Sequence, residues 1–255
     1  MSNSWSPTQY DRFAKERRQP FLDLVALVRT PVARAVDLGC GTGETTAHFH
    51  RALGLATTVG VDSSAAMLEK SRAFEGGGLS FRQGAIETFA PDAPLDLVFS
   101  NAAFHWVPDH QALLRRLVAF LAPGGQLAVQ LPAMQDAPTH GAAVEVASEE
   151  PFSQALSGAT TFQTALSPEA YAKLLDELGA KEQHVRLQIY AHHLPAREDV
   201  VEWVRGSTLT AYQARLPADL WPLFLSRYRE RLMEKLEETR PFLFLFQRVL
   251  MWGRW

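Results

Sequence analysis

The first half of the chain alternates short apolar runs with longer segments of mixed polarity. Five runs have the length and side chains of buried strands, at residues 33–38, 57–62, 79–83, 95–100 and 126–131. Segments with apolar residues at helical spacing lie before and between them, at residues 22–28, 44–53, 65–73 and 109–120. Strands that alternate with such helices indicate βαβ units, so the pattern predicts an α/β fold with a doubly wound parallel sheet.

The alternation breaks down after residue 131. Residues 132–166 show no strand pattern, whereas a helix is expected at 168–178 and a strand at 184–190. Two further amphipathic segments, at residues 196–212 and 217–237, predict two more helices.

The last apolar run, residues 242–252, has two interpretations. Its aromatic residues and neighbouring arginines are typical of a segment that lies at a membrane interface. We favour the last strand of a sheet, because strands that are buried on both faces are continuously apolar.

Composition and charge limit the class of protein. Hydrophobic residues make up 47% and charged residues 21% of the 255 residues, which is ordinary for one large globular domain. The formal net charge of −3 provides no basic field for nucleic acid, and no apolar stretch predicts a membrane span. The N-terminal residues lack the apolar segment of a secretory signal, and the single Cys40 excludes an intramolecular disulfide. We therefore expect a cytoplasmic protein, monomeric or homodimeric.

A glycine-rich turn follows the first predicted strand. It contains Gly39, Gly41 and Gly43, and Asp62 ends the next strand nineteen residues after the third glycine. A strand, a glycine turn, a helix start and an acid at the next strand tip form a nucleoside site. Such a site lies at the carboxyl edge of a parallel sheet.

Two cofactors compete for this site. A dinucleotide fingerprint needs glycine at the sixth position from Gly39, where this chain has Glu44, whose carboxylate repels a diphosphate. The spacing Asp-x-Gly-x-Gly-x-Gly, which starts at Asp37, is instead typical of S-adenosylmethionine-dependent methyltransferases. Their glycines let the backbone approach the amino acid portion, Asp37 orients its ammonium group, and Asp62 accepts both ribose hydroxyls. We expect S-adenosyl-L-methionine, with a nicotinamide oxidoreductase as the disfavoured alternative.

From end to end the chain resembles a class I S-adenosylmethionine-dependent methyltransferase, and more narrowly the trans-aconitate 2-methyltransferases. The resemblance implies a seven-stranded, mostly parallel sheet of the Rossmann-like methyltransferase fold, with a helical lid insert. The motifs that match, besides the glycine turn, are Tyr10, Phe13-Ala14, Arg17, Val61-Asp62-Ser63-Ser64, Met67-Leu68, Asn101-Ala102-Ala103, Trp106, Pro108-Asp109-His110, Val129-Gln130, Pro138-Thr139-His140 and Trp203-Val204.

The resemblance also implies an organisation within a single methyltransferase domain, residues 1–255. Its expected parts are amino-terminal lid helices at 1–29, a cofactor-binding core at 30–131, helical substrate-lid inserts at 132–180 and 196–240, and the last strands of the sheet at 181–195 and 241–255.

Site residues carried over by the resemblance fall into two groups. The expected cofactor-binding residues are Asp37, Gly39, Gly41, Asp62, Ser63, Met67, Ala85, Ile86 and Asn101. The expected substrate-binding residues are Tyr10, Arg17, Arg205 and Tyr212. Each substrate residue also reads as part of an ordinary amphipathic helix or solvated surface.

Three positions depart from the family pattern. The adenine-side motif of the family usually carries an Asp, whereas this chain has Gly84-Ala85-Ile86, which leaves Glu87 or the backbone to bond the adenine amine. Thr210 stands where the aconitate enzymes have Arg, and a Thr cannot grip a carboxylate bidentately. His105 stands where they have Gln. The resemblance therefore supports the reaction class more firmly than the substrate.

His105 and Trp106 are the candidate catalytic residues at the tip of the fourth strand. His105 is either a general base or a side chain that hydrogen-bonds the substrate. Trp106 either lies over the sulfonium or the acceptor through cation–π attraction, or packs in the core.

No metal site is expected. His192 and His193 are neighbours in a predicted strand, so their side chains point to opposite faces. Cys40 has no second cysteine and reads as a small residue that fills the glycine turn.

The leading hypothesis is methyl transfer to a small-molecule carboxylate. Such an acceptor is already ionised at neutral pH and needs no base. The alternatives are a phenol, alcohol or lipid-like acceptor with His105 as base, or a non-catalytic protein that only binds the cofactor.

Overall fold

The computed structural model describes residues 14–161 and 165–255, without the side chains of residues 14–17, and the chain divides into two compact units. Unit 1 comprises Met1–Arg18, Met134–Gln163 and Ile189–Gln247. Unit 2 comprises Gln19–Ala133, Thr164–Gln188 and Arg248–Trp255. The role of any segment as a substrate lid stays a prediction.

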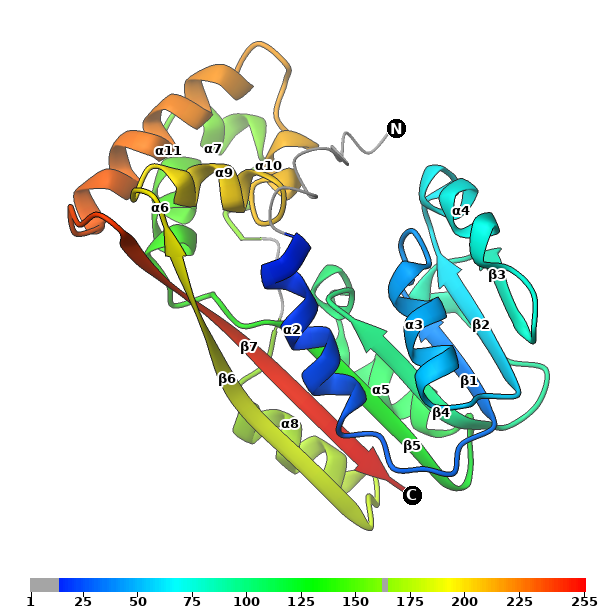
Figure 1. Cartoon of the computed structure of the whole chain (residues 1–255). Helices are drawn as coiled ribbons and strands as arrows, with labels where there is room; N and C mark the ends of the chain where they lie inside the picture. Colours follow the sequence, from blue (N-terminus) through cyan, green and yellow to red (C-terminus); the bar gives the residue numbers. More distant parts are fainter. Residues whose placement is uncertain (1–13, 162–164) are drawn as a thin grey trace. The chain divides into compact units, whose positions relative to one another are not determined.

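Seven strands form one sheet in the order β3-β2-β1-β4-β5-β7-β6 (Figure 1). The pairs β2–β3, β1–β2, β1–β4 and β4–β5 are parallel, whereas β7 is antiparallel to β5. The predicted seven-stranded, mostly parallel sheet is confirmed. The strands are β1 Arg34–Leu38, β2 Thr57–Asp62, β3 Leu79–Gln83, β4 Leu95–Asn101, β5 Leu121–Pro132, β6 Glu182–Leu194 and β7 Phe242–Arg254.

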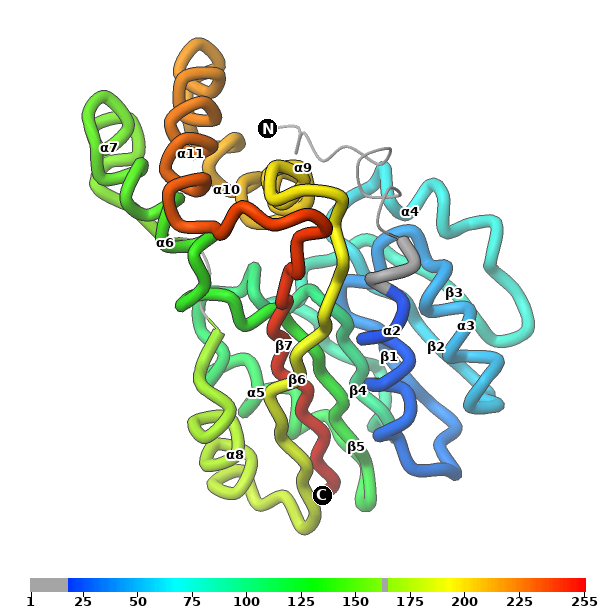
Figure 2. The backbone as a smooth tube through the Cα atoms, turned by 60° about the vertical axis from the view of Figure 1, so that its left-hand side comes forward, coloured from blue at the N-terminus to red at the C-terminus, as the bar shows by residue number. Residues whose placement is uncertain are grey.

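In unit 2, helices cover both faces of the sheet, as the tube view also shows (Figure 2). On one face, Phe21 of α2 and Phe49 of α3 pack against Phe99 of β4. On the other face, residues of α5 and α8 form a second core with β1, β4, β5 and β7. These helices, with the shorter α4, are α2 Ala14–Val25, α3 Glu44–Ala52, α4 Ala65–Ser71, α5 His110–Val118 and α8 Pro168–Glu177.

Local sequence sets where several of these helices begin. The side chains of Ser64, Asp109 and Ser167 each accept a hydrogen bond from the backbone N–H three residues later. Such N-caps satisfy donors that a helix start leaves unpaired.

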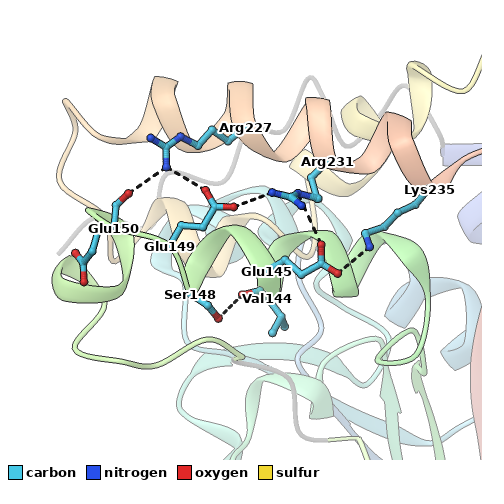
Figure 3. Close-up of polar contacts among 8 residues, drawn as sticks. All are labelled: Val144, Glu145, Ser148, Glu149, Glu150, Arg227, Arg231 and Lys235. Carbon is cyan, nitrogen blue, oxygen red and sulfur yellow. Dashed lines mark hydrogen bonds and ion pairs between the residues drawn. The ribbon is translucent and has the colours of Figure 1, made fainter.

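Unit 1 is helical apart from its parts of β6 and β7, and it has its own core. Phe224 of α11 stacks on Tyr212 of α10 and contacts Phe152 of α7 edge-on. On the surface of this unit, α6 and α11 are joined by an ion-pair network (Figure 3). Its helices are α6 Pro138–Ala147, α7 Phe152–Ala155, α9 Asp199–Arg205, α10 Thr210–Gln213 and α11 Trp221–Lys235.

One element prediction needs correction, and the favoured interpretation of another segment is confirmed. The helix expected at 196–212 is broken into α9 and α10, because Gly206 ends α9 and the Thr210 hydroxyl donates to the Ser207 carbonyl at 2.5 Å. The run at 242–252 is strand β7, which excludes the membrane-interface segment. No helix among the described residues is long and apolar enough to cross a membrane.

Candidate active site at the carboxyl edge of the sheet

The glycine turn after β1 is tied to the tip of β2. The backbone N–H groups of Gly39 and Cys40 both donate to the Val61 carbonyl, at 2.8 and 3.1 Å. The Asp62 carboxylate accepts from the N–H of Gly41 at 2.8 Å and from the N–H of Ser64 at 2.9 Å. These bonds fix the Asp62 side chain, and a carboxylate has about four acceptor sites, so lone pairs remain for two ribose hydroxyls.

Two glycines of this turn are required for different reasons. Gly39 has φ +80°, and a Cβ there would lie 2.2 Å from the Cβ of Ala103, beyond the end of β4. Gly41 also has positive φ, +56°, but a Cβ there would meet nothing within 4 Å. Gly39 therefore lets two loops touch, whereas Gly41 borders open space.

Asp37 is buried beneath the turn. The Thr46 hydroxyl donates to its Oδ2 at 2.6 Å, whereas Oδ1 is buried with no hydrogen-bond partner among the described residues. Burial raises the pKa of Asp37 to about 7, and the nearby Asp62 carboxylate adds to the rise. An ammonium group would satisfy Oδ1 and favour the ionised form, which fits the amino acid portion of S-adenosylmethionine.

The loop after β4 begins with a strained residue. Ala102 has φ 57°, although it is not glycine, and its N–H donates to the Gln130 carbonyl at 2.8 Å. The Asn101 side chain accepts from the Gln130 amide at 2.6 Å. Backbone strain of this kind is concentrated at functional sites.

His105 and Trp106 lie together in a 3₁₀ turn, η3 (Phe104–Trp106). His105 is buried, and its ring centroid lies 4.5 Å from that of Trp106. The Trp106 indole is 47% exposed, so its alternative role as a core side chain is excluded.

Two buried hydrogen bonds connect this turn to α5 and α8. His110 Nε2–H donates to the Phe104 carbonyl at 2.8 Å, so its Nδ1 accepts from the Tyr171 hydroxyl at 2.5 Å. Burial lowers the pKa of His110, which keeps it in this neutral form. Tyr171 was not among the predicted site residues, because it lies 61 residues away from His110 along the chain.

The expected adenine side lies in η2 (Ile86–Thr88). The Arg116 guanidinium of α5 donates to the carbonyls of Ile86, at 2.6 Å, and of Phe89, which holds this turn. Burial lowers the pKa of Arg116, and the carboxylate of the exposed Glu87 offsets part of this decrease. Arg116 was missed from the sequence, because an arginine on an amphipathic helix reads as a surface residue.

Cys40 is not a nucleophile in this setting. Its side chain is buried, and burial together with the carboxylates of Asp37 and Asp62 raises the pKa of the thiol. It fills the turn, in agreement with the sequence analysis. No group of three metal-ligating side chains occurs among the described residues.

Of the remaining predicted residues, Ser63 directly follows Asp62 at the tip of β2, where its carbonyl accepts from Gln83 Nε2 at 3.0 Å, and Met67 lies in the first turn of α4. Arg205 and Tyr212 belong to unit 1. Arg205 lies 3.8 Å from Glu202, and the buried Tyr212 hydroxyl donates to the Thr160 carbonyl at 2.6 Å.

Two predicted substrate residues cannot be placed. Tyr10 lies outside the described residues, and Arg17 is helical but its side chain lies outside them.

Comparisons with known proteins agree with this geometry. A family model described as "Methyltransferase domain" matches residues 36–129, which hold the glycine turn and the tips of β2 and β4. Among solved structures, the YcgJ protein from Bacillus subtilis has a TM-score of 0.61 at 15% identity, covering 93% of this chain and 98% of that one. A putative methyltransferase from Bacillus halodurans has a TM-score of 0.57 at 19% identity, covering 92% and 97%. At these identities the likeness supports the fold alone.

Full-length relatives of known family are more similar in sequence. A trans-aconitate 2-methyltransferase from Deinococcus radiodurans is 42% identical, covering 97% of this chain and 96% of the relative. One from Variovorax paradoxus is 41% identical, covering 89% and 88%. The predicted enzyme class and cofactor are thereby confirmed, and the nicotinamide and non-catalytic alternatives are not supported. The chain belongs to the trans-aconitate 2-methyltransferase family of class I S-adenosylmethionine-dependent methyltransferases.

Proposed function

We propose that this methyltransferase esterifies a small polycarboxylate of the trans-aconitate type. The observation that carries the proposal is the 42% identity, over 97% of the chain, with a relative named trans-aconitate 2-methyltransferase. When bound, S-adenosylmethionine supplies a methyl group that its sulfonium already activates. The acceptor carboxylate forms the new O–C bond as the C–S bond breaks, so no proton has to be removed.

The protein's contribution is then to hold and align rather than to act as a base. A carboxylate with a pKa near 4 is ionised at neutral pH. Proximity and alignment are worth about 7–11 kcal/mol in favourable cases. We propose that Asp37, Asp62 and the open backbone at Gly41 hold the cofactor, and that His105 and Trp106 orient the acceptor.

The cofactor and substrate assignments extend to the other predicted residues. Gly39, Ser63, Met67, Ala85, Ile86 and Asn101 complete the proposed cofactor set. Arg205 and Tyr212, with Tyr10 and Arg17, stay proposed substrate-binding residues. Arg205 supports this assignment because a guanidinium fork matches a carboxylate. The protein is proposed to act without nucleic acid, as a monomer or homodimer in the cytoplasm.

The test is methyl transfer from labelled S-adenosylmethionine to trans-aconitate, beside a panel of mono- and dicarboxylates, phenols and alcohols. We expect trans-aconitate to react fastest, with kcat constant between about pH 6.5 and 8.5 because a carboxylate stays ionised there. Arg205→Met is expected to raise KM for trans-aconitate about tenfold, since one charge-assisted hydrogen bond is lost.

His105 variants separate orientation from base catalysis. His105→Gln is expected to keep most of the turnover and the flat pH profile, and His105→Ala to lower kcat by less than about tenfold. His193→Ala, an exposed histidine of β6, is the control. A preference for phenols, with kcat falling at low pH and lost by about 10²–10⁴-fold in His105→Ala, would instead establish a base.

A further inference from the structure

A buried arginine lies at the carboxyl edge of the sheet in unit 2. Arg248 of β7 is only 7% exposed, and its guanidinium donates to Gln130 Oε1 of β5 at 2.8 Å. Gln130 is 1% exposed, and its Nε2 donates to Asn101 Oδ1 of β4 at 2.6 Å. The three side chains thus form a hydrogen-bonded relay across three neighbouring strands.

The strand register explains why they meet. Asn101 is paired with Gln130 in the parallel β4–β5 ladder, so their side chains share a face. Gln130 is paired with Leu250, and Arg248 lies two residues before Leu250 in β7, which places it on that same face.

The proposed cofactor residue Asp37 shares this face as well. It is paired with Phe99 of β4, two residues before Asn101. One period of the pleat, two residues, therefore places the Asp37 carboxylate and the Asn101 amide on one side of adjacent strands, at the edge where ligands of such sheets bind.

The relay has a defined polarity. A guanidinium can only donate hydrogen bonds, so Gln130 must present its oxygen to Arg248 and its NH₂ to Asn101. Asn101 must then present its oxygen to Gln130, which leaves the NH₂ on the outer branch of its amide. An isolated asparagine amide could take either orientation, and Arg248 removes that choice.

We propose that Arg248 and Gln130 are positioning residues that hold Asn101 as a hydrogen-bond donor for a carboxylate. An NH₂ group recognises a carboxylate oxygen and cannot accept from an ammonium or a hydroxyl. The carboxylate belongs either to the amino acid portion of the cofactor, whose ammonium is assigned to Asp37, or to the acceptor. This inference rests on the proposed use of the sheet edge as the ligand site.

Four variants test it. Asn101→Asp replaces the donor by an acceptor of the same shape, which repels a carboxylate. Arg248→Met removes the donor that fixes the relay, and Arg248→Lys restores a donor. Arg254→Met is the control, because Arg254 lies on the same strand but is exposed and contacts Glu182 at 3.3 Å.

Two binding measurements and one kinetic measurement distinguish the two carboxylates. Calorimetry gives Kd for S-adenosylhomocysteine and for 5′-methylthioadenosine, which lacks the amino acid portion, and steady-state kinetics gives KM for trans-aconitate. If Asn101 binds the cofactor's carboxylate, Asn101→Asp should raise the Kd for S-adenosylhomocysteine about ten- to hundredfold and leave the Kd for 5′-methylthioadenosine unchanged. If the acceptor's carboxylate is bound, KM rises by that factor and both Kd values stay the same.

In either case Arg248→Met should change the same constants as Asn101→Asp, but by a smaller factor. Arg248→Lys should bring these constants back close to the wild-type values. The inference is overturned if Asn101→Asp changes none of the three constants, or raises the Kd values for both nucleosides by the same factor. It is also overturned if a folded Arg248→Met matches the wild type. If Arg248→Met does not fold, Asn101→Asp and Arg248→Lys decide. The two Kd values do not depend on the acceptor, so they stand even if trans-aconitate is not the substrate.

Discussion

At the residue scale, the buried carboxyl of Asp37 links cofactor binding to pH. Burial raises its pKa from 3.8 to about 7, so the folded protein holds this proton more tightly than the unfolded chain does. As pH rises from about 4 to 7, the unfolded state loses the proton first, and the free energy of unfolding of the ligand-free protein falls. Above about pH 7 both states are ionised, and this contribution is constant.

Cofactor affinity should change in the opposite direction. An ammonium group binds the ionised carboxylate, so the affinity for S-adenosylhomocysteine is expected to rise up to about tenfold per pH unit between pH 5.5 and 7. Asp37→Asn should bind about ten- to hundredfold more weakly at pH 8 and lose the pH dependence. Calorimetric titration at several pH values measures both, with Asp176→Asn, an exposed acid of α8, as control. A pH-independent affinity in the wild type would show that Asp37 does not meet the ammonium.

At the element scale, the β1–α3 turn and the loop after β4 are built to touch. Gly39 makes this contact, because a Cβ there would lie 2.2 Å from the Cβ of Ala103. The turn also carries the Asp62 contacts through the Gly41 N–H, so moving it disturbs the cofactor residues directly.

Gly39→Ala is therefore expected to lower the free energy of unfolding by more than backbone strain alone would. A left-handed alanine costs about 1–2 kcal/mol, and the clash adds to it and displaces the turn. Gly54→Ala is a matched control, since Gly54 has φ +63° but a Cβ there would meet nothing within 4 Å. Urea unfolding should show the larger loss for Gly39→Ala, and only that variant should lose affinity for S-adenosylhomocysteine. Equal losses in both variants would mean that the loops do not need this close approach.

At the scale of the whole molecule, the two units have separate means of stabilisation. The proposed cofactor residues lie in unit 2, whereas the α6–α11 ion-pair network lies in unit 1 (Figure 3). In that network Glu149 contacts both Arg227 and Arg231 at 3.0 Å, and Lys235 contacts Glu145 at 2.7 Å. Networks of this kind contribute more than isolated surface pairs.

We expect the two units to respond separately during unfolding. Glu149→Gln should destabilise unit 1 by about 1 kcal/mol, less in high salt, while Glu177→Gln, which loses one exposed pair at 3.6 Å in unit 2, should change little. S-adenosylhomocysteine should stabilise unit 2 alone, by mass action. Amide hydrogen exchange measures the effect of the variants and that of the ligand, when the rates in α6 and α11 of unit 1 are compared with the rates in β1 and β2 of unit 2. Exchange that changes equally in both units under each perturbation would contradict this expectation.

The reaction class and most elements of unit 2 could be predicted from local sequence patterns. Residues 57–62 and 79–83 are strands as expected, because strand length, turn glycines and caps such as Asp109 act within a few residues. The acid, glycine and strand order around Asp37 and Asp62 is equally local.

The contacts between polar side chains, in contrast, could not be predicted without the folded arrangement of the strands. Arg248 read as a flank of an apolar run, yet the antiparallel pairing of β7 with β5 places it on Gln130, 118 residues away along the chain. The contacts of Arg116 with Ile86 and of Tyr171 with His110 depend likewise on packing between distant helices and loops. The break between α9 and α10 at Gly206 was not predicted, because a glycine inside a helical pattern costs only about 1 kcal/mol and many helices tolerate it. Local patterns specify elements, whereas the partners of a buried polar group depend on strand order and register.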